Sequence, residues 1–369
     1  MRTIEKPALA LSWLLAAAIT GPALAQDAKP DAKPAAPSLS DVLASSGLTV
    51  TGYVDGTYSY ESISPPVGSS VDSNTFALNQ ASLSLAYLPS SGFGALVNPV
   101  AGTEARNGCY AAGYLPCSSA DSTNSFNLLQ AYVQYSGGKS TVLLGKFVTL
   151  AGAEVAAPTG DVNVTRSLLF WFSEPVTHVG ARLTYAASAS ASLMVGVNNG
   201  WNVDSSTGSG KTLELGFSLA PSKTLAFAGA AYYGDMDREQ GLDARTLVDL
   251  VATWTVTPKL TVIGNVDWDQ QKLAGGASAK WWGIATYANY AINDTWRTSL
   301  RLEYLDDQDG FATGLVGSGG KLDEGTLTFG YAASKNFEFR FEGRYDTAKS
   351  DAGADLKTTQ AWLQCLYRF

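Results

Sequence analysis

Histidine, cysteine and charged residues are all scarce in this chain. Its 369 residues include one histidine, three cysteines and 16% charged residues, whereas a soluble domain is usually about one-quarter charged. With His178 alone and no Cys-x-x-Cys pair, the sequence predicts no metal site and no cofactor. The net charge of −8 argues against a nucleic-acid partner and against basic attachment to anionic lipid.

Long apolar runs are lacking as well. No segment after the N-terminus approaches the roughly eighteen consecutive apolar residues that a transmembrane helix needs. The composition is nevertheless 46% hydrophobic, with 37 glycines and 17 tyrosines. Such a composition suits strands that have one face in lipid and the other in water.

The first residues predict export. Arg2 and Lys6 precede a short apolar stretch that ends in a small-x-small site at Ala25, which is typical of a cleaved secretory signal. The stretch is too short for the alternative, a retained membrane anchor. The predicted organisation is a signal peptide over 1–25, a Pro/Ala-rich periplasmic spacer over 26–47 and an outer-membrane β-barrel over 48–369.

Apolar and polar residues alternate from about Leu48 to Phe369, with short and long connections taking turns. A transmembrane barrel needs tight periplasmic turns and long external loops, whereas a soluble sandwich, the alternative for any single strand, has no reason to sort its loops. The sequence therefore predicts an all-β, transmembrane antiparallel β-barrel of about 16 strands. Short turns are expected at 89–92, 136–139, 187–190, 221–223, 257–259, 293–294 and 334–336, and long loops at 62–74, 102–124, 151–173, 201–210, 235–242, 271–279, 307–323 and 348–353.

Tyrosine and tryptophan collect at the ends of the predicted strands. These side chains favour the membrane interface, because one end is apolar and the other forms hydrogen bonds. Two aromatic belts are therefore expected. The inner belt would contain Tyr87, Tyr135, Tyr185, Trp254, Tyr290, Tyr331 and Tyr367, and the outer belt Tyr58, Trp201, Tyr233, Trp268, Tyr304 and Tyr345.

Charged residues fall on the face opposite the apolar one. In the segment 336–345, phenylalanines alternate with glutamate and arginine, and an arginine on the lipid face would cost roughly 2–4 kcal/mol. So many inward charges would be intolerable in a dry core, so a water-filled lumen is expected. The predicted pore wall includes Lys146, Arg182, Arg245, Asp249, Asp267, Arg297, Arg301, Arg340 and Arg344.

The loop 151–173 contains five consecutive large apolar residues at 168–172. An exposed loop rarely carries such a run, so we expect this loop to fold against the inner wall and narrow the channel. The alternative is that 168–172 extends the following strand. The predicted constriction residues are Glu154, Asp161, Arg166 and Glu174.

Two of the three cysteines lie close together in a Gly/Ser/Asn-rich loop. Cys109 and Cys117 are a candidate disulfide outside the cytoplasm, the alternative being two free thiols. Cys365 lies on the apolar face of the last strand and is interpreted as a small hydrophobic residue.

The last strand alternates in the same way and stops on Phe369, which resembles the closing strand of a bacterial outer-membrane barrel. We therefore expect the barrel-assembly machinery to recognise the chain through Phe369.

Several short segments, read in order, resemble the OmpL-like β-barrel porin family (putative β-barrel porin-2). The resemblance is densest from about residue 50 to 235, and the later strands match in pattern only. It implies a channel in the bacterial outer membrane, and a third loop that narrows the lumen is also similar to the general bacterial porins. The segments are Tyr53-Val-Asp-Gly-Thr-Tyr-Ser-Tyr60, Gln130-Ala-Tyr-Val133, Gly145-Lys-Phe-Val-Thr149, Arg166-Ser-Leu-Leu-Phe170, Thr177-His-Val-Gly-Ala-Arg182 and Val197-Asn-Asn-Gly-Trp201.

Passive diffusion of small hydrophilic solutes is the favoured function. A barrel enzyme would need a nucleophile with a positioned base, and the neighbours of His178 offer none. The alternative is a structural or adhesive barrel whose external loops bind a partner. The expected partners are outer-membrane lipids and small solutes, with a homo-oligomer left open, and the mixed charges of the constriction predict weak cation selectivity.

Overall fold

The computed structural model describes residues 43, 45–62, 74–106, 126–205, 210–235, 242–273, 275–314, 318–353 and 355–369. The signal peptide 1–25, nearly all of the spacer 26–47 and the cysteines Cys109 and Cys117 lie outside these ranges, so the statements about them stay predictions. No helix among the described residues is long and apolar enough to cross a membrane.

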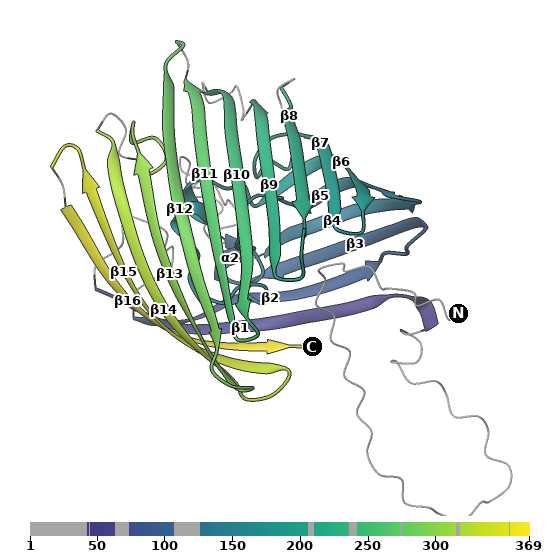
Figure 1. Ribbon diagram of the computed structural model, residues 1–369, viewed down its shortest axis with the longest axis horizontal. Helices are drawn as coiled ribbons and strands as arrows, with labels where there is room; N and C mark the ends of the chain where they lie inside the picture. The colour runs from purple at the N-terminus through teal and green to yellow at the C-terminus, as the bar shows by residue number, and fades with distance from the viewer. Residues whose placement is uncertain are drawn as a thin grey trace, which may run out of the picture.

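The described strands form a closed antiparallel barrel in which each strand pairs with its neighbours in sequence and β1 pairs with β16 (Figure 1). This confirms the predicted fold and strand number. The strands are β1 (Thr49–Glu61), β2 (Thr75–Tyr87), β3 (Gly92–Ala101), β4 (Phe126–Gly137), β5 (Ser140–Val148), β6 (Thr177–Ser188), β7 (Ala191–Asn198), β8 (Thr212–Leu219), β9 (Leu225–Asp235), β10 (Leu242–Thr257), β11 (Leu260–Leu273), β12 (Ser278–Ala291), β13 (Trp296–Asp307), β14 (Gly320–Ala332), β15 (Phe337–Ser350) and β16 (Asp355–Arg368).

Strand alternation follows the sequence pattern closely. On β15, Phe341 is 47% exposed on the outer face, whereas its neighbours Arg340 and Glu342 are buried inside. Two predicted long loops are shorter than expected, because β11 continues to Leu273 and β15 to Ser350. Polar composition therefore does not mark where the hydrogen-bonded ladders of these strands end.

Most aromatic side chains predicted to lie in the belts point outward. Tyr87, Trp254 and Trp268 are each more than 40% exposed. Trp201 is an exception, since it is only 3% exposed and packs with Tyr232 in an interior cluster. The assignment of Trp201 to the outer belt was therefore wrong.

The barrel closes where the last residue meets the first strand. Backbone hydrogen bonds join Gly52 and Phe369 in both directions, at 3.0 and 2.9 Å. A Cβ atom at position 52 would overlap the Phe369 ring, so only glycine leaves room for this aromatic side chain. Two short helices, α2 (Thr103–Arg106) and α3 (Leu168–Phe172), complete the described elements.

Candidate pore constriction

The connection between β5 and β6, residues 149–176, folds into the barrel rather than away from it. Its two ends are joined by a hydrogen bond from the Thr149 amide to the Val176 carbonyl, at 3.0 Å. From this base the loop bonds to strands on several sides of the interior. We call residues 149–176 the inner loop.

The first residues of the inner loop bond to the wall formed by β9, β10 and β11. Three consecutive strands each supply one inward side chain as the acceptor of a loop amide, so the loop follows the wall. The contacts are Leu150 N to Tyr232 Oη (2.9 Å), Gly152 N to Asp249 Oδ1 (3.1 Å) and Ala153 N to Asn265 Oδ1 (2.6 Å).

The middle of the inner loop bonds to the other side of the barrel, on β13, β14 and β15. Glu342 accepts hydrogen bonds from two successive loop amides, and arginines of the wall donate to loop carbonyl groups. The contacts are Val164 N and Thr165 N to Glu342 (2.6 and 2.9 Å), Asn163 Nδ2 to Thr328 Oγ1 (2.7 Å), Arg301 Nη1 to Thr165 O (2.7 Å), Arg344 Nη1 to Arg166 O (2.6 Å) and Arg340 Nη1 to Pro158 O (3.1 Å).

A third contact reaches β2, where Gln80 Nε2 donates to the Ala156 carbonyl at 2.9 Å. The inner loop is therefore bonded to the wall at β2, at β9–β11 and at β13–β15. A segment bonded on all these sides crosses the interior, and any solute passing through the barrel must pass beside it.

The apolar run at 168–172 forms the helix α3 and does not extend β6, which begins at Thr177. Ser167 caps the helix by accepting from the Phe170 amide at 3.0 Å, and the Glu303 carboxylate accepts from the Leu168 amide at 2.9 Å. These acceptors satisfy amides that would otherwise be unpaired at a buried helix start.

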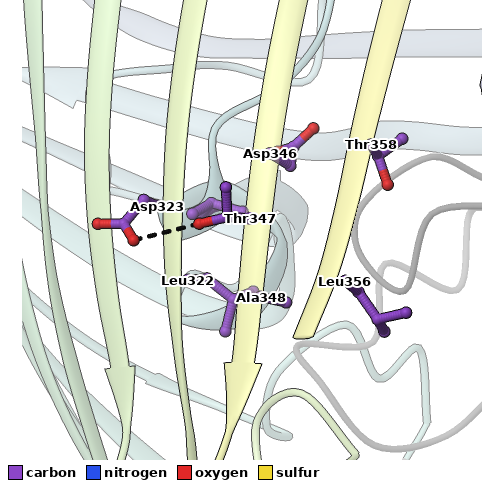
Figure 2. Close-up of a pocket in the computed structure, with 8 residues that line it drawn as sticks. Leu322, Asp323, Asp346, Thr347, Ala348, Leu356 and Thr358 are labelled. Carbon is purple, nitrogen blue, oxygen red and sulfur yellow. Dashed lines mark hydrogen bonds between the residues drawn. The ribbon is translucent and has the colours of Figure 1, made fainter. Parts of the chain in front are cut away.

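Helix α3 packs against the wall on one side of the barrel. Leu168 and Leu169 belong to a buried cluster with Leu322, Ala348 and other residues of β12–β15. Figure 2 shows this wall, with Leu322 and Ala348 beside the hydrogen bond from Thr347 to Asp323. The apolar run is thus buried inside the barrel, as the sequence predicted.

Arg166 lies within the inner loop and holds its shape. Its side chain is only 4% exposed and donates to the carbonyls of Val155 (2.9 Å) and Ala156 (3.0 Å). Its Nε lies 3.1 Å from Asp161 Oδ2. Glu154 accepts from the Ser167 amide at 2.6 Å and pairs with Arg301, so these charged groups fix one loop conformation.

Two loop carboxyls have raised pKa values. Burial raises the pKa of Asp161 to about 7, although the nearby Arg166 lowers it. Burial also raises the pKa of Glu174 well above its usual range, and the neighbouring Asp249 carboxylate adds to the shift. Both side chains are buried.

Five arginines of the predicted wall are paired with carboxylates, whereas the sequence predicted only hydration by a water-filled lumen. Arg301 is fully buried and contacts Glu154 at 2.7 Å and Glu324 at 3.1 Å. Pairing is the other way in which a barrel interior tolerates ions. The remaining pairs of predicted wall residues are Arg182–Glu214 (2.5 Å), Arg297–Glu338 (2.5 Å), Arg340–Glu338 (3.2 Å) and Arg344–Asp346 (2.7 Å).

One predicted wall residue, Lys146, lies on the outer face instead. Lys146 alternates with Val142 and Leu144, which are exposed on the outer face, and its ammonium pairs with Asp204 at 2.7 Å. Lys146 is therefore not on the inner face.

Arg245 faces inward but is enclosed. Its guanidinium lies over the rings of Trp201, Trp281 and Phe311, at 4.9, 5.3 and 5.5 Å from their centroids. Three aromatic faces around one cation fix its position by cation–π attraction, so Arg245 braces the interior wall.

A cavity of about 380 Å³ lies beside the inner loop, at the end of the barrel that carries the short turns. The Glu338 carboxylate in this cavity pairs with three arginines, Arg297, Arg340 and Arg368. Three guanidiniums around one carboxylate leave local positive charge. The ionisable lining residues are Asp161, Lys259, Arg297, Glu338, Arg340 and Arg368.

The sequence-based site omitted several partners of the inner loop. Glu342 and Glu303 follow the inward alternation of their strands, and that pattern identifies them as inward-facing. Tyr232, Asn265 and Gln80 carry no comparable signal, because a polar inward residue binds the loop only when the folded loop reaches it.

Comparison with known proteins agrees with this geometry. A similar solved structure is the outer membrane channel DcaP of Acinetobacter baumannii, at 12% identity and TM-score 0.63, covering 87% of this chain and 97% of that one. Another is the trimer form of OmpT of Vibrio cholerae, at 8% identity and TM-score 0.61, covering 87% and 99%. A third is the anion-selective porin from Comamonas acidovorans, at 12% identity and TM-score 0.60, covering 87% and 99%. At these identities the likeness shows the barrel fold.

No curated protein matches the sequence. The model of one family, described as putative beta-barrel porin-2, OmpL-like, matches residues 47–365. That range includes the inner loop and every described strand except the last residues of β16. The family and the fold imply an outer-membrane channel rather than an enzyme. The chain therefore belongs to the putative beta-barrel porin-2, OmpL-like family and is a porin of the bacterial outer membrane.

Proposed function

We propose that small hydrophilic solutes diffuse passively through this porin and that the inner loop sets the narrowest point of their path. The observation that carries the proposal is the crossing of the interior by a loop bonded to β2, β9–β11 and β13–β15. In this proposal Glu154, Asp161 and Arg166 fix the loop conformation, and Glu174 lies at its far end, close to Asp249 and Asp267 of the wall. Conductance should then be low for a barrel of this size.

The charges near the cavity support a preference for anionic solutes. Arg297 and Arg368 retain 27% and 34% exposure of their side chains while sharing Glu338. The acids at Glu154 and Asp161 are each engaged by an arginine and are almost fully buried. This arrangement replaces the weak cation selectivity expected from the sequence, since the groups nearest to water are mainly basic.

Reversal potentials across planar bilayers test the selectivity. The double variant Arg297→Gln/Arg368→Gln should lose most of the anion preference in low salt, where charges are least screened. The matched control is Lys357→Gln, which removes an exposed positive charge of β16 outside the cavity. Equal anion preference in the double variant and the native porin would refute this assignment.

Bilayer conductance also separates the channel from the alternative function. The tight packing around α3 is the observation that favours a structural or adhesive barrel. A channel gives discrete conductance steps, and a bilayer of lipid without protein gives none. Reconstituted barrels that give no steps under any applied voltage would favour the structural barrel.

We propose further partners on less direct grounds. Outer-membrane lipids would contact the apolar outer face, and the barrel-assembly machinery would recognise the strand that ends at Phe369. A homo-oligomer is also proposed, because one similar porin structure is a trimer form; native mass spectrometry of the detergent-extracted porin measures its subunit number.

A further inference from the structure

Three carboxylates converge where the inner loop leaves and rejoins the wall. Glu174 comes from the end of the loop, Asp249 from β10 and Asp267 from β11. One oxygen from each lies within 4.8 Å of the others, and the side chains are between 0 and 2% exposed. They form the only such group of potential metal ligands found among the described ranges.

These carboxylates lack the basic partners that several other buried acids have. Glu174 Oε2, Asp249 Oδ2 and Asp267 Oδ2 accept no hydrogen bond. No ion pair between residues that the structure describes joins any of the three to a basic side chain, whereas Glu154, Glu214, Glu324 and Glu338 each have an arginine. Uncompensated buried carboxylates are costly, and either protonation or a bound cation removes that cost.

Neighbouring groups orient the free oxygens without neutralising them. The Asn265 amide donates to Asp249 Oδ1 at 2.8 Å and to Asp267 Oδ1 at 3.2 Å. The Gly152 amide donates to the same Asp249 oxygen at 3.1 Å. Each aspartate therefore uses one oxygen for the protein and keeps the second unpaired, as outer-shell hydrogen bonds do at metal sites.

We propose that Glu174, Asp249 and Asp267 bind one divalent cation of the calcium class inside the barrel. Hard cations prefer oxygen ligands, and calcium accepts carboxylates at about 2.3–2.6 Å in flexible geometry. Two oxygens on opposite sides of such an ion lie at most about 5 Å apart, and one oxygen from each of the three carboxylates lies within 4.8 Å of the others. Asp269, two residues along β11, has two further oxygens without hydrogen-bond partners.

The position of this site gives it a mechanical role. Glu174 lies at one end of the inner loop, and Gly152, bonded to Asp249, lies at the other. A cation shared by the loop and by two strands holds both ends against the wall. The site thus makes the shape of the constriction dependent on divalent cations.

Calcium binding to the purified full-length porin in detergent tests the proposal. After treatment with EDTA and dialysis, calorimetric titration with calcium chloride should show about one site per chain, filled in the submillimolar to millimolar range of extracellular calcium sites. The triple variant Glu174→Gln/Asp249→Asn/Asp267→Asn should lose this site. Asp55→Asn is the matched control, because Asp55 is 1% exposed and also lacks hydrogen-bond partners but lies on β1.

Thermal unfolding supplies a second measurement. The difference in unfolding temperature between the triple variant and the native porin should change sign between EDTA and excess calcium. With EDTA the triple variant should unfold at a higher temperature than the native porin, because repulsion between the acids is gone. With calcium in excess the order should reverse, since only the native porin gains the ion. Any one of three results would overturn the proposal. The triple variant could bind calcium with the same stoichiometry as the native porin, or the Asp55→Asn control could lose the site. The order of the unfolding temperatures could also stay the same with and without calcium. None of these measurements depends on conductance, so they fail or succeed independently of the proposed pore function.

Discussion

Arg301 connects more parts of the candidate site than any other side chain described above. It is fully buried on β13 and joins acids of the wall, Glu303 and Glu324, to the loop acid Glu154. It also donates to the Thr165 carbonyl. Removing one member of such a network leaves buried charges without partners. The free-energy cost of those unpaired charges is usually larger than the net stabilisation that the intact network provides.

Arg301→Gln should therefore destabilise the barrel by roughly 3–5 kcal/mol, measured by urea unfolding and refolding in detergent. The exposed pair of Lys357 and Asp355, at 3.9 Å, provides the contrast. Lys357→Gln should change stability by at most about 1 kcal/mol. Similar losses in both variants would mean that the Arg301 network is not a special source of stability.

Asp161 gives the barrel a dependence on pH. Burial raises its pKa to about 7, with Glu154 raising it further and Arg166 and Arg340 lowering it, against about 3.9 in an unfolded chain. A raised acid pKa favours the neutral form in the folded state, so this contribution to stability is complete below about pH 4 and disappears as the pH rises toward 7.

The expected result is a difference between native porin and Asp161→Asn that depends on pH. Relative to the variant, the native porin should lose thermal stability between about pH 4 and about pH 7, while the variant, which cannot ionise there, shows only the background trend. Unfolding temperatures measured across that range provide the comparison. A constant difference between the two proteins would contradict the assignment.

At the scale of the elements, the position of the inner loop depends on a single glycine. Gly152 has a φ of +91°, and a Cβ atom there would overlap the Glu174 carboxylate. Gly152→Ala should therefore cost roughly 1–3 kcal/mol and displace the loop from the wall, which raises single-channel conductance. Gly343→Ala on β15 is the control, since its Cβ would meet open space. Unchanged conductance in Gly152→Ala would show that the position of the inner loop does not determine the pore size.

The sequence predicted strands better than it predicted the loop contacts. Alternation placed Arg301, Arg340 and Asp267 inside because period two depends only on local geometry. The assignment of Lys146 to the pore wall was wrong, because its alternation with Val142 and Leu144 places it on the outer face. It lies near a strand end, where Asp204 is available.

The apolar run at 168–172 predicted burial but not helix α3, since five residues are too few to show a helical period. The partners of the inner loop depend on which wall groups the folded loop meets. Many of those contacts join residues more than a hundred positions apart, such as Thr165 and Arg301, and no local pattern contains them.

For the whole molecule, the alternation of turn lengths predicts the orientation in the membrane. In intact cells, an impermeant thiol reagent should label Gln308→Cys, between β13 and β14, and should not label Ser334→Cys, between β14 and β15. Both positions are exposed in the structure, so access through the membrane decides the result. Cys109 and Cys117 are first replaced by serine to remove background. The opposite labelling pattern would reverse the orientation.

The seam between β1 and β16 has a consequence for the order of folding. Tyr53 pairs with Arg368, so the ladder that closes the barrel joins the two ends of the described chain. Contacts so distant in sequence form slowly, and until they form both strands present unpaired edges that favour aggregation. A polypeptide emerging from its N-terminus first cannot complete this barrel step by step, so β1 must wait, protected from other chains, for the last residues to arrive.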